Sequence, residues 1–305
     1  MPTAELQTDI TIDQRVQNDL NRSSRFENDN ARIAEYYRET MEDYRVWSRA
    51  GYMHVGFWRP WTNPFYRQKM LEATNDEVFV SLRLPDLIAG QVADLGCGTG
   101  AVSSYGLDHF PKLAWTAYSI CPEQIEAAKL RFSRPRIRFE LADFHRLPLE
   151  SSSLDAAFFV ESFCYSSEPE LALGESARVL KPGGRLVIVD GMFRKPRLRT
   201  PKWALKIADS AARGWALKQF HAAPDIEQLA KLQGFEIESI REFGWSVFPS
   251  LAYSPPLVAW HTLRLLLTGR LKGWRREHLR ACAMFVLFGL FRSQFGYFQF
   301  SMIKK

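Results

Sequence analysis

The sequence predicts an α/β protein with a Rossmann-like, seven-stranded and mostly parallel sheet beneath a helical cap. Two observations support this fold class. From about residue 91, short apolar runs alternate with amphipathic segments, which is typical of parallel strands joined by helices. A glycine-rich turn follows the first apolar run and leads into a helical pattern, as it does in ligand-binding α/β domains.

The apolar runs define the strands of this sheet, and the amphipathic segments define the helices between them. The expected strands are Gln91–Leu95, Leu113–Ser119, Ile137–Leu141, Leu154–Val160, Arg185–Asp190, Phe235–Glu242 and Tyr297–Ile303. The expected intervening helices are Pro122–Phe132, Glu168–Leu180 and Asp225–Leu232.

The cap is expected to come from three parts of the chain. Residues 1–85 read as an N-terminal helical lid, and residues 86–305 as the Rossmann-like domain, with helical insertions at about 195–220 and 253–292. Helices in these insertions do not fit inside the sheet, so we expect them over the strand ends. The apolar stretches Leu257–Leu267 and Ala281–Phe291 leave three interpretations open: a substrate tunnel, a patch resting on an anionic membrane, or helices packed on the sheet.

Composition limits the class of protein. The hydrophobic fraction of 46% and the charged fraction of 24% are ordinary for a globular protein. Four widely spaced cysteines without a CxxC pair argue for reduced thiols and against structural zinc, so we expect no metal site in the protein itself. The polar N-terminus lacks a signal-peptide core, which favours a cytoplasmic location. Basic clusters after residues 193 and 263 suit a solvated face, nucleic acid, anionic lipid or a phosphorylated substrate.

The glycine-rich turn is the strongest signal in the sequence. Gly96, Gly98 and Gly100 allow a sharp turn and a close approach to a ligand. Dinucleotide sites use GxGxxG spacing, whereas here the third glycine comes one residue early. Asp94 precedes the turn, where a carboxylate would face a ligand ammonium group.

This turn resembles motif I of the class I methyltransferases, which use S-adenosylmethionine. Ala142-Asp143-Phe144 resembles the segment that holds adenine, and Ser119 stands where most members carry an acidic residue for the ribose. As in tocopherol methyltransferases and cyclopropane synthases, Ser119 and Gln124 would share that ribose contact. The resemblance implies cofactor contacts from Asp94, Gly96, Cys97, Gly98, Gly100, Ser119, Ile120, Gln124, Ala142, Asp143, Phe144 and Glu161.

The segment after the fourth strand is expected to face the transferred methyl group. Its Glu161-Ser-x-x-Tyr165 pattern resembles geranyl diphosphate C-methyltransferases, which implies that Glu161 and Tyr165 are catalytic. Two further residues are implied to be catalytic by resemblance. Tyr37 lies in a Tyr-Tyr segment that resembles the helix capping the site in similar proteins, and His54 lies in a segment that resembles the His-x-Gly-aromatic segment of the tocopherol and sterol methyltransferases. The structural alternatives are a helix cap or an arginine partner for Glu161 and a hydrogen-bonded structural role for His54. Further aromatic residues are candidates for the cavity lining: Tyr36, Tyr44, Phe57, Trp58 and Phe163.

These resemblances favour C-methylation of an isoprenoid or an isoprenoid diphosphate, with Mg²⁺ as a companion if the substrate is a diphosphate. O- or N-methylation of a lipophilic phenol or amine, and a non-methylating cyclase that binds S-adenosylmethionine, are the alternatives. Nucleic acid is a poor substrate, because the fourth strand is not followed by the Asn/Asp-Pro-Pro-aromatic segment of nucleic-acid N-methyltransferases. Peripheral membrane contact and homo-oligomer formation stay open.

Overall fold

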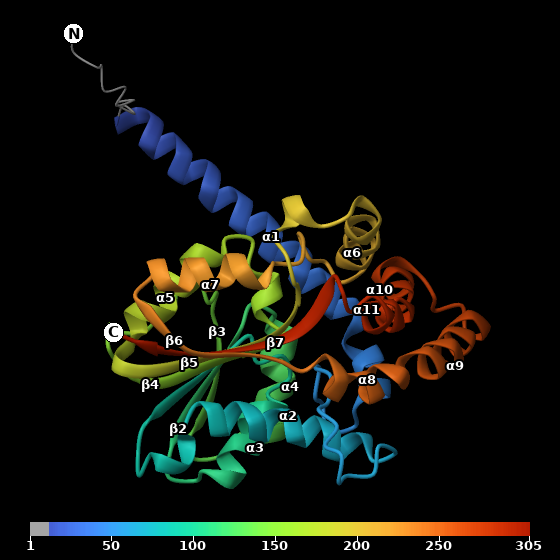
Figure 1. Ribbon diagram of the computed structural model, residues 1–305, viewed down its shortest axis with the longest axis horizontal. Helices are drawn as coiled ribbons and strands as arrows, with labels where there is room; N and C mark the ends of the chain where they lie inside the picture. The colour runs from blue at the N-terminus through green and yellow to red at the C-terminus, as the bar shows by residue number, and fades with distance from the viewer. Residues whose placement is uncertain (1–11) are drawn as a thin grey trace.

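The structure is a computed structural model, and it describes residues 12–305; residues 1–11 of the expected lid lie outside the described part. A seven-stranded sheet in the order β3-β2-β1-β4-β5-β7-β6 forms its centre (Figure 1). The strands are β1 (Gln91–Leu95), β2 (Ala114–Ser119), β3 (Ile137–Leu141), β4 (Leu154–Val160), β5 (Leu180–Phe193), β6 (Phe235–Glu242) and β7 (Phe295–Lys304). Strands β1 to β5 pair in parallel, and β7 runs antiparallel to β5 and β6. The prediction of a Rossmann-like, mostly parallel sheet is confirmed.

Helices cover both faces of this sheet. The helices α5 and α7 lie over one face and α2 and α3 over the other (Figure 1), while α4 packs against β2 and β3. Their bounds are α2 (Arg67–Ser81), α3 (Ala101–His109), α4 (Pro122–Phe132), α5 (Pro169–Val179) and α7 (Ala223–Leu232). The expected helix Pro122–Phe132 has the same bounds as α4, and the other two expected helices differ from α5 and α7 by one or two residues at their ends.

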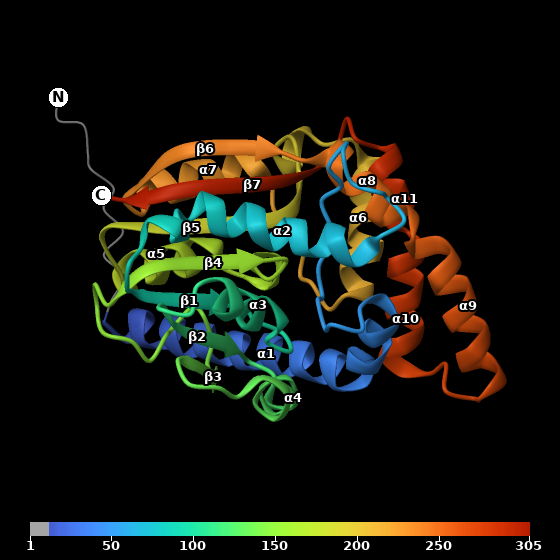
Figure 2. The same ribbon diagram turned by 90° about the horizontal axis from the view of Figure 1, so that it is seen from below.

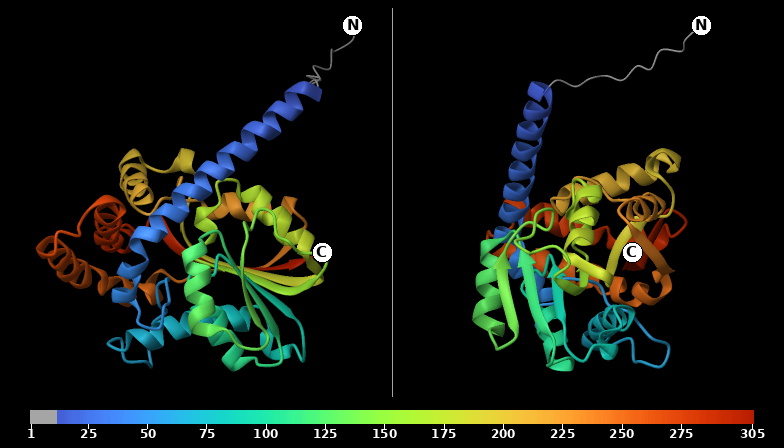
Figure 3. Two further views of the ribbon diagram at one scale, coloured as in Figure 1. Left: turned by 180° about the vertical axis from the view of Figure 1, so that it is seen from behind. Right: turned by 90° about the vertical axis from the view of Figure 1, so that its left-hand side faces the viewer.

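A second group of helices gathers beyond the carboxyl ends of the parallel strands (Figure 2). These are α6 (Lys202–Gly214), α8 (Gly244–Ala252), α9 (Ser254–Leu267), α10 (Gly273–Ala283) and α11 (Phe285–Leu290). The long helix α1 (Ile12–Trp47) runs past the sheet to reach α9 and α10 (Figure 3). The sequence did not predict α8, whose interior Pro249 reads as a helix breaker.

Strand β5 is longer than predicted, as is its partner β7. Their antiparallel pairing runs from Arg185 opposite Ile303 to Phe193 opposite Phe295. Met192 and Phe193 are buried at the end of β5, so the strand continues past Asp190 under the cap helices. This extension brings the carboxyl end of β5 close to the cap.

Strand register places two acidic residues beside each other at the edge of the sheet that faces the cap. Val160 at the end of β4 lies opposite Val189 of β5. The backbone N–H of Glu161 then donates to the carbonyl of Val189 at 2.9 Å, one residue before Asp190. The two carboxylates are therefore held by neighbouring strands at the end where ligands bind in such sheets.

Candidate active site

A cavity of about 70 Å³ lies over the carboxyl ends of β1, β2 and β4. Its lining contains eleven of the twelve residues expected to contact the cofactor: Asp94, Gly96, Cys97, Gly98, Ser119, Ile120, Gln124, Ala142, Asp143, Phe144 and Glu161. Asn30, Met53 and His145 also line it and were not predicted. We refer to it as the cofactor cavity.

The three glycines of the turn have different surroundings, although all have positive φ. A Cβ on Gly96 would lie 2.4 Å from the Cβ of Ser162, and one on Gly100 would lie 2.4 Å from the ring of Phe139. A Cβ on Gly98 would meet only the flexible side chain of Met53. Gly100 does not line the cavity and instead precedes α3. Gly96 and Gly100 are therefore required for packing, whereas Gly98 is the position where a side chain would enter the cavity.

Asp94 is buried at the end of β1 and accepts a hydrogen bond from the Ser103 hydroxyl at 2.6 Å. Burial raises the pKa of Asp94 to about 7, and the bond from Ser103 opposes this rise. A cationic group placed in the cavity would favour the carboxylate form. Asp94 is thus suited to meet an ammonium group.

The end of β2 supplies a neutral hydrogen-bonding pair to the cavity. The Ser119 hydroxyl donates to Oε1 of Gln124 at 2.7 Å, and both side chains are buried. Across the cavity, Asp143 accepts hydrogen bonds from Asn30 at 2.7 Å and from the ring of His145 at 2.6 Å. The cavity therefore offers polar atoms on two sides, as a nucleoside requires.

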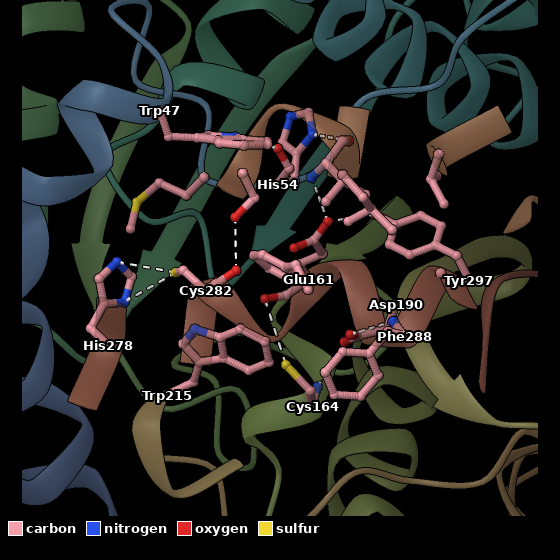
Figure 4. A pocket seen from close by; sticks show the side chains of 18 of the residues that line it. Trp47, His54, Glu161, Cys164, Asp190, Trp215, His278, Cys282, Phe288 and Tyr297 are labelled. Atoms are coloured by element: carbon pink, nitrogen blue, oxygen red, sulfur yellow. Dashed lines mark hydrogen bonds between the residues drawn. The ribbon is translucent and has the colours of Figure 1, made fainter. Parts of the chain in front are cut away.

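A larger cavity of about 190 Å³ lies between the sheet edge and the cap helices (Figure 4). We refer to it as the substrate cavity. Its walls come from α1, α8, α9, α10 and α11 and from the ends of β4, β5 and β7, and they are mostly aromatic and aliphatic. Trp47, Trp215, Phe220, Phe285 and Phe288 are among the lining side chains.

Five residues line both cavities: Tyr37, Met53, His54, Glu161 and Tyr165. All four predicted catalytic residues belong to this set, and only Met53 was not predicted. The rings of Tyr37 and Tyr165 lie 5.6 Å apart between centroids, which joins α1 to the segment after β4. The structure thus brings the four candidates together at the boundary of the two cavities.

Glu161 occupies the centre of this boundary (Figure 4). Its Oε1 accepts hydrogen bonds from the Val55 N–H at 2.6 Å and from the Tyr297 hydroxyl at 2.7 Å. Enclosure away from bulk water raises the pKa of Glu161 to about 7, and both bonds oppose the rise. Its φ of +50° is unusual for a residue with a side chain. Glu168, not Glu161, precedes α5 at its N-cap position, and no arginine among the described residues pairs with Glu161, so neither structural role that the sequence left open is observed.

His54 and Asp190 complete the polar groups near Glu161. Burial lowers the pKa of His54 to about 4, so its ring is neutral, and its Nδ1 lies 2.9 Å from the Val55 carbonyl. Burial raises the pKa of Asp190 to about 7. Both Asp190 oxygens are occupied, because they accept the N–H groups of Cys164 and Gly191 at 2.8 Å each. Sequence reasoning missed Asp190, although its place at the end of β5 was a usable signal.

The aromatic candidates divide between the cavity and the core. Tyr44 lines the substrate cavity, whereas Tyr36, Phe57 and Phe163 are buried and line neither cavity. The Tyr36 hydroxyl instead lies 2.8 Å from Nδ1 of His278. The indole N–H of Trp58 donates to the carbonyl of Thr62 in the loop before α2. Of these five candidates only Tyr44 lines a cavity, and the other four are aromatic residues of the core or of a loop.

Charged groups in the substrate cavity are mainly acidic. Asp43, Glu161 and Asp190 line it, and Arg292 is the one lysine or arginine among its described lining residues. The guanidinium of Arg292 lies 3.6 Å from the ring centroid of Trp245. No group of three or more potential metal ligands occurs among the residues described. This environment suits a neutral molecule better than a diphosphate.

Comparison with known proteins identifies the family. Residues 93–188 match the model described as "Methyltransferase domain". An O-methyltransferase (cnsE) of Penicillium expansum is 29% identical over 224 residues, which cover 72% of this chain and 77% of that protein. An S-adenosyl-L-methionine-dependent Diels-Alderase (iccD) of Talaromyces variabilis is 31% identical over 185 residues, covering 56% of this chain and 60% of that protein. A geranyl diphosphate methyltransferase, solved with GPP and sinefungin, shares the fold with a TM-score of 0.70 at 16% identity, covering 91% of this chain and 100% of that one.

S-adenosylmethionine is the cofactor of this family, and the cofactor cavity fits it. Gly98 leaves room for a ligand against the turn, and Asp94 would offer a buried carboxylate to the amino group of the methionine moiety. Ser119, Gln124 and Asp143 would offer polar atoms to the nucleoside. The sheet order, the glycine-rich turn and the match to the family model lead to one conclusion: the chain belongs to the class I S-adenosylmethionine-dependent methyltransferases.

Proposed function

We propose that this methyltransferase acts on a hydroxyl oxygen of an uncharged, lipophilic small molecule such as a phenol. The observation that carries the proposal is the position of Glu161, whose carboxylate lies between the cofactor cavity and the substrate cavity. The relatedness to an O-methyltransferase supports the same class of acceptor. The acidic, aromatic lining supports an acceptor without phosphate groups.

Glu161 is suited to accept the proton of such a hydroxyl group. The hydrogen bonds from Val55 and Tyr297 both end on Oε1, and none among the described residues reaches Oε2. A pKa near 7 lets the carboxylate take up a proton at neutral pH and release it afterwards. When bound, the cofactor supplies an electrophilic methyl group. Glu161 would accept the O–H proton as the oxygen takes the methyl group, while the methyl–sulfur bond breaks and its electron pair stays on the sulfur of S-adenosylhomocysteine.

The isoprenoid diphosphate favoured by the sequence has less support. Such a substrate carries a cluster of negative charge, whereas the cavity contains three carboxyl groups and the single Arg292. Transfer of a diphosphate into this cavity carries a desolvation cost that one arginine offsets only in part. A neutral isoprenoid avoids this cost, and methylation of its double bond is tested by the same assay.

The experiment is a methyl-transfer assay with a panel of lipophilic phenols, amines, neutral isoprenoids and geranyl diphosphate. S-adenosylhomocysteine is measured together with the product structure by NMR. We expect S-adenosylhomocysteine and O-methyl ether in equal amounts from a phenol. A C-methylated or N-methylated product, or consumption of substrate without S-adenosylhomocysteine, would overturn the proposal; the last result would indicate a cyclase.

The Glu161→Gln variant tests the role of the carboxylate with a matched control. We expect its turnover to fall at least about a hundredfold, the scale typical of a lost general base, with cofactor affinity nearly unchanged. Asp190→Asn removes a carboxylate from the same cavity, and its amide can keep only one of the two bonds from backbone N–H groups, so the folding of this variant is checked by its cofactor affinity. Its turnover should fall by less than about tenfold. Near-normal turnover of Glu161→Gln would remove Glu161 from the mechanism.

A further inference from the structure

Helix α9 has two faces of different character. On its inner face, Leu257, Val258 and His261 line the substrate cavity. On its outer face, exposed apolar residues follow helical spacing: Trp260 (56% exposed), Leu263 (56%), Leu266 (58%) and Leu267 (79%). The helix lies at the outer edge of the cap, away from the sheet (Figure 2). No other described element covers this outer face, because these four side chains are exposed in the whole chain.

Basic residues outnumber acidic ones around this face. Residues 243–276 contain five arginines and lysines and no aspartate or glutamate. Arg264 lies over the ring of Trp260, at 5.9 Å from its centroid, and Lys272 and Arg276 are exposed beyond the end of the helix. Arg270 and Arg275 share Glu42 of α1 as an ion-pair partner. The outer face thus combines a tryptophan and leucines with exposed positive charge.

A neighbouring loop adds exposed aromatic residues. The hydroxyl of Tyr253, just before α9, donates to the carbonyl of Pro64 at 3.0 Å. This bond holds the loop before α2 against the start of α9. In that loop, Trp61 is 80% exposed and Phe65 is 82% exposed. Exposed aromatic side chains from two separate segments therefore lie near the same end of the molecule.

We propose that the outer face of α9 docks on the surface of an anionic phospholipid membrane. Apolar residues with Trp and Leu, bordered by Arg and Lys, are the features by which a helix lies in the interfacial region of a bilayer. Positive charge next to this face attracts the headgroups of anionic lipids. None of the described helices has the length and apolarity needed to cross a bilayer.

A second copy of this chain fits the face less well. In a two-fold symmetric dimer the same patch meets itself, so Arg264, Lys272 and Arg276 would share one interface with the same three basic residues of the other copy. Like charges brought together in this way oppose association. An anionic membrane instead satisfies both the apolar and the basic parts of the face.

Docking through the outer face of α9 would bring the substrate cavity close to the membrane, because the inner face of the same helix lines that cavity. This step rests on the proposed function, in which the acceptor is a lipophilic molecule that dissolves in lipid. A single helix then separates the bilayer from the cavity, with Leu257 and Val258 on one side and Leu263 and Leu267 on the other. Docking would place the cavity next to the phase in which such a substrate is most concentrated.

The test is vesicle flotation of the full-length protein. Vesicles of phosphatidylcholine alone are compared with vesicles that also contain phosphatidylglycerol. We expect binding to the anionic vesicles, which weakens as salt is added, and little binding to the neutral ones. The variant Leu263→Glu/Leu267→Glu should lower the partition coefficient at least about tenfold. Arg264→Gln/Lys272→Gln should lower it by a similar factor at low salt.

A matched control uses the same chemical change elsewhere. Leu130 on α4 and Leu232 on α7 are 92% and 70% exposed, and Leu130→Glu/Leu232→Glu should float like the unchanged protein. Cofactor affinity, measured for every variant, shows that each is folded. Flotation does not depend on methyl transfer, so the two experiments test separate proposals. The protein can methylate phenols without binding vesicles, and it can bind vesicles without methylating phenols. Equal binding of all variants, no binding to anionic vesicles, or a stable dimer that the Leu263→Glu/Leu267→Glu change dissociates would overturn the proposal.

Discussion

The two cavities of this methyltransferase are built in different ways. The cofactor cavity is formed mainly by short segments at the carboxyl ends of neighbouring parallel strands, and its key groups are backbone turns and small polar side chains. The substrate cavity is formed by helices from both ends of the chain, and its lining is large and apolar. They meet at Tyr37, Met53, His54, Glu161 and Tyr165. The comparison indicates that cofactor binding and substrate choice can be changed separately, except at these five residues.

The largest expected effect is a loss of cofactor affinity when Gly98, which lines only the cofactor cavity, is replaced. Gly98→Val places a side chain in the cofactor cavity and should weaken S-adenosylmethionine binding at least about a hundredfold, measured by calorimetry. Gly183→Val is the control, because Gly183 also has positive φ, and a Cβ added there would have no atom within 4 Å. Both variants carry similar backbone strain, so both should lose stability to a similar extent. Wild-type cofactor affinity in Gly98→Val would refute the assigned cofactor cavity.

The second effect concerns the boundary itself. Glu161 accepts a proton only as a carboxylate, so kcat/KM should fall about tenfold per pH unit below about 7 and level off above it. Tyr297→Phe removes a donor that favours the carboxylate, which raises the pKa of Glu161. We expect the inflection in the pH–rate profile to move upward by about half to one unit. Tyr253→Phe, away from Glu161, should leave the inflection in place; a flat profile would contradict a titrating base.

A smaller effect should be confined to the substrate cavity. Val258→Phe adds bulk to the inner face of α9 and should raise the KM for the lipophilic acceptor about tenfold, with cofactor affinity unchanged. Ala259→Phe adds the same group at the next position, which is exposed, and should leave the KM for the same acceptor unchanged when no membrane is present. Equal effects of the two changes would show that α9 does not form the wall that we describe.

The smallest effect tests the neutral pair at the end of β2. Gln124→Ala removes the acceptor of the Ser119 hydroxyl and should weaken cofactor binding by about 0.5–1.5 kcal/mol. Substrate KM should not change. An unaltered cofactor dissociation constant would show that other groups, such as Asp143, provide the contacts to the nucleoside.

The difference between the cavities also explains what the sequence could predict. The cofactor cavity depends on local patterns, such as an apolar strand followed by a glycine-rich turn, and those patterns identified eleven of its residues. Gly100 was the exception, because a close contact with Phe139 explains this glycine better than a ligand does. A glycine required for packing and a glycine required for ligand binding look the same in the sequence.

The substrate cavity depends on the arrangement of helices, which local patterns do not specify. Tyr36 and Tyr37 are neighbours on α1, yet one turns into the core toward His278 and the other into the cavity. Which of them faces a ligand is decided by the packing of α10 against α1. Trp215 and Phe288 could not be assigned in advance for the same reason, since each comes from a separate cap segment.

The left-handed backbone of Glu161 has a consequence for the evolution and engineering of this enzyme. A non-glycine residue in this conformation costs of order 1–3 kcal/mol, and its enclosed carboxyl group lies near that of Asp190. The hydrogen bonds that Glu161 accepts from Val55 and Tyr297 offset part of this cost, so a replacement at position 161 exchanges backbone strain for two unpaired donors. A library screened only for thermal tolerance does not test the role that we propose for Glu161, so variants changed at this position should also be assayed for turnover. Any programme to make this methyltransferase heat-resistant should hold position 161 constant.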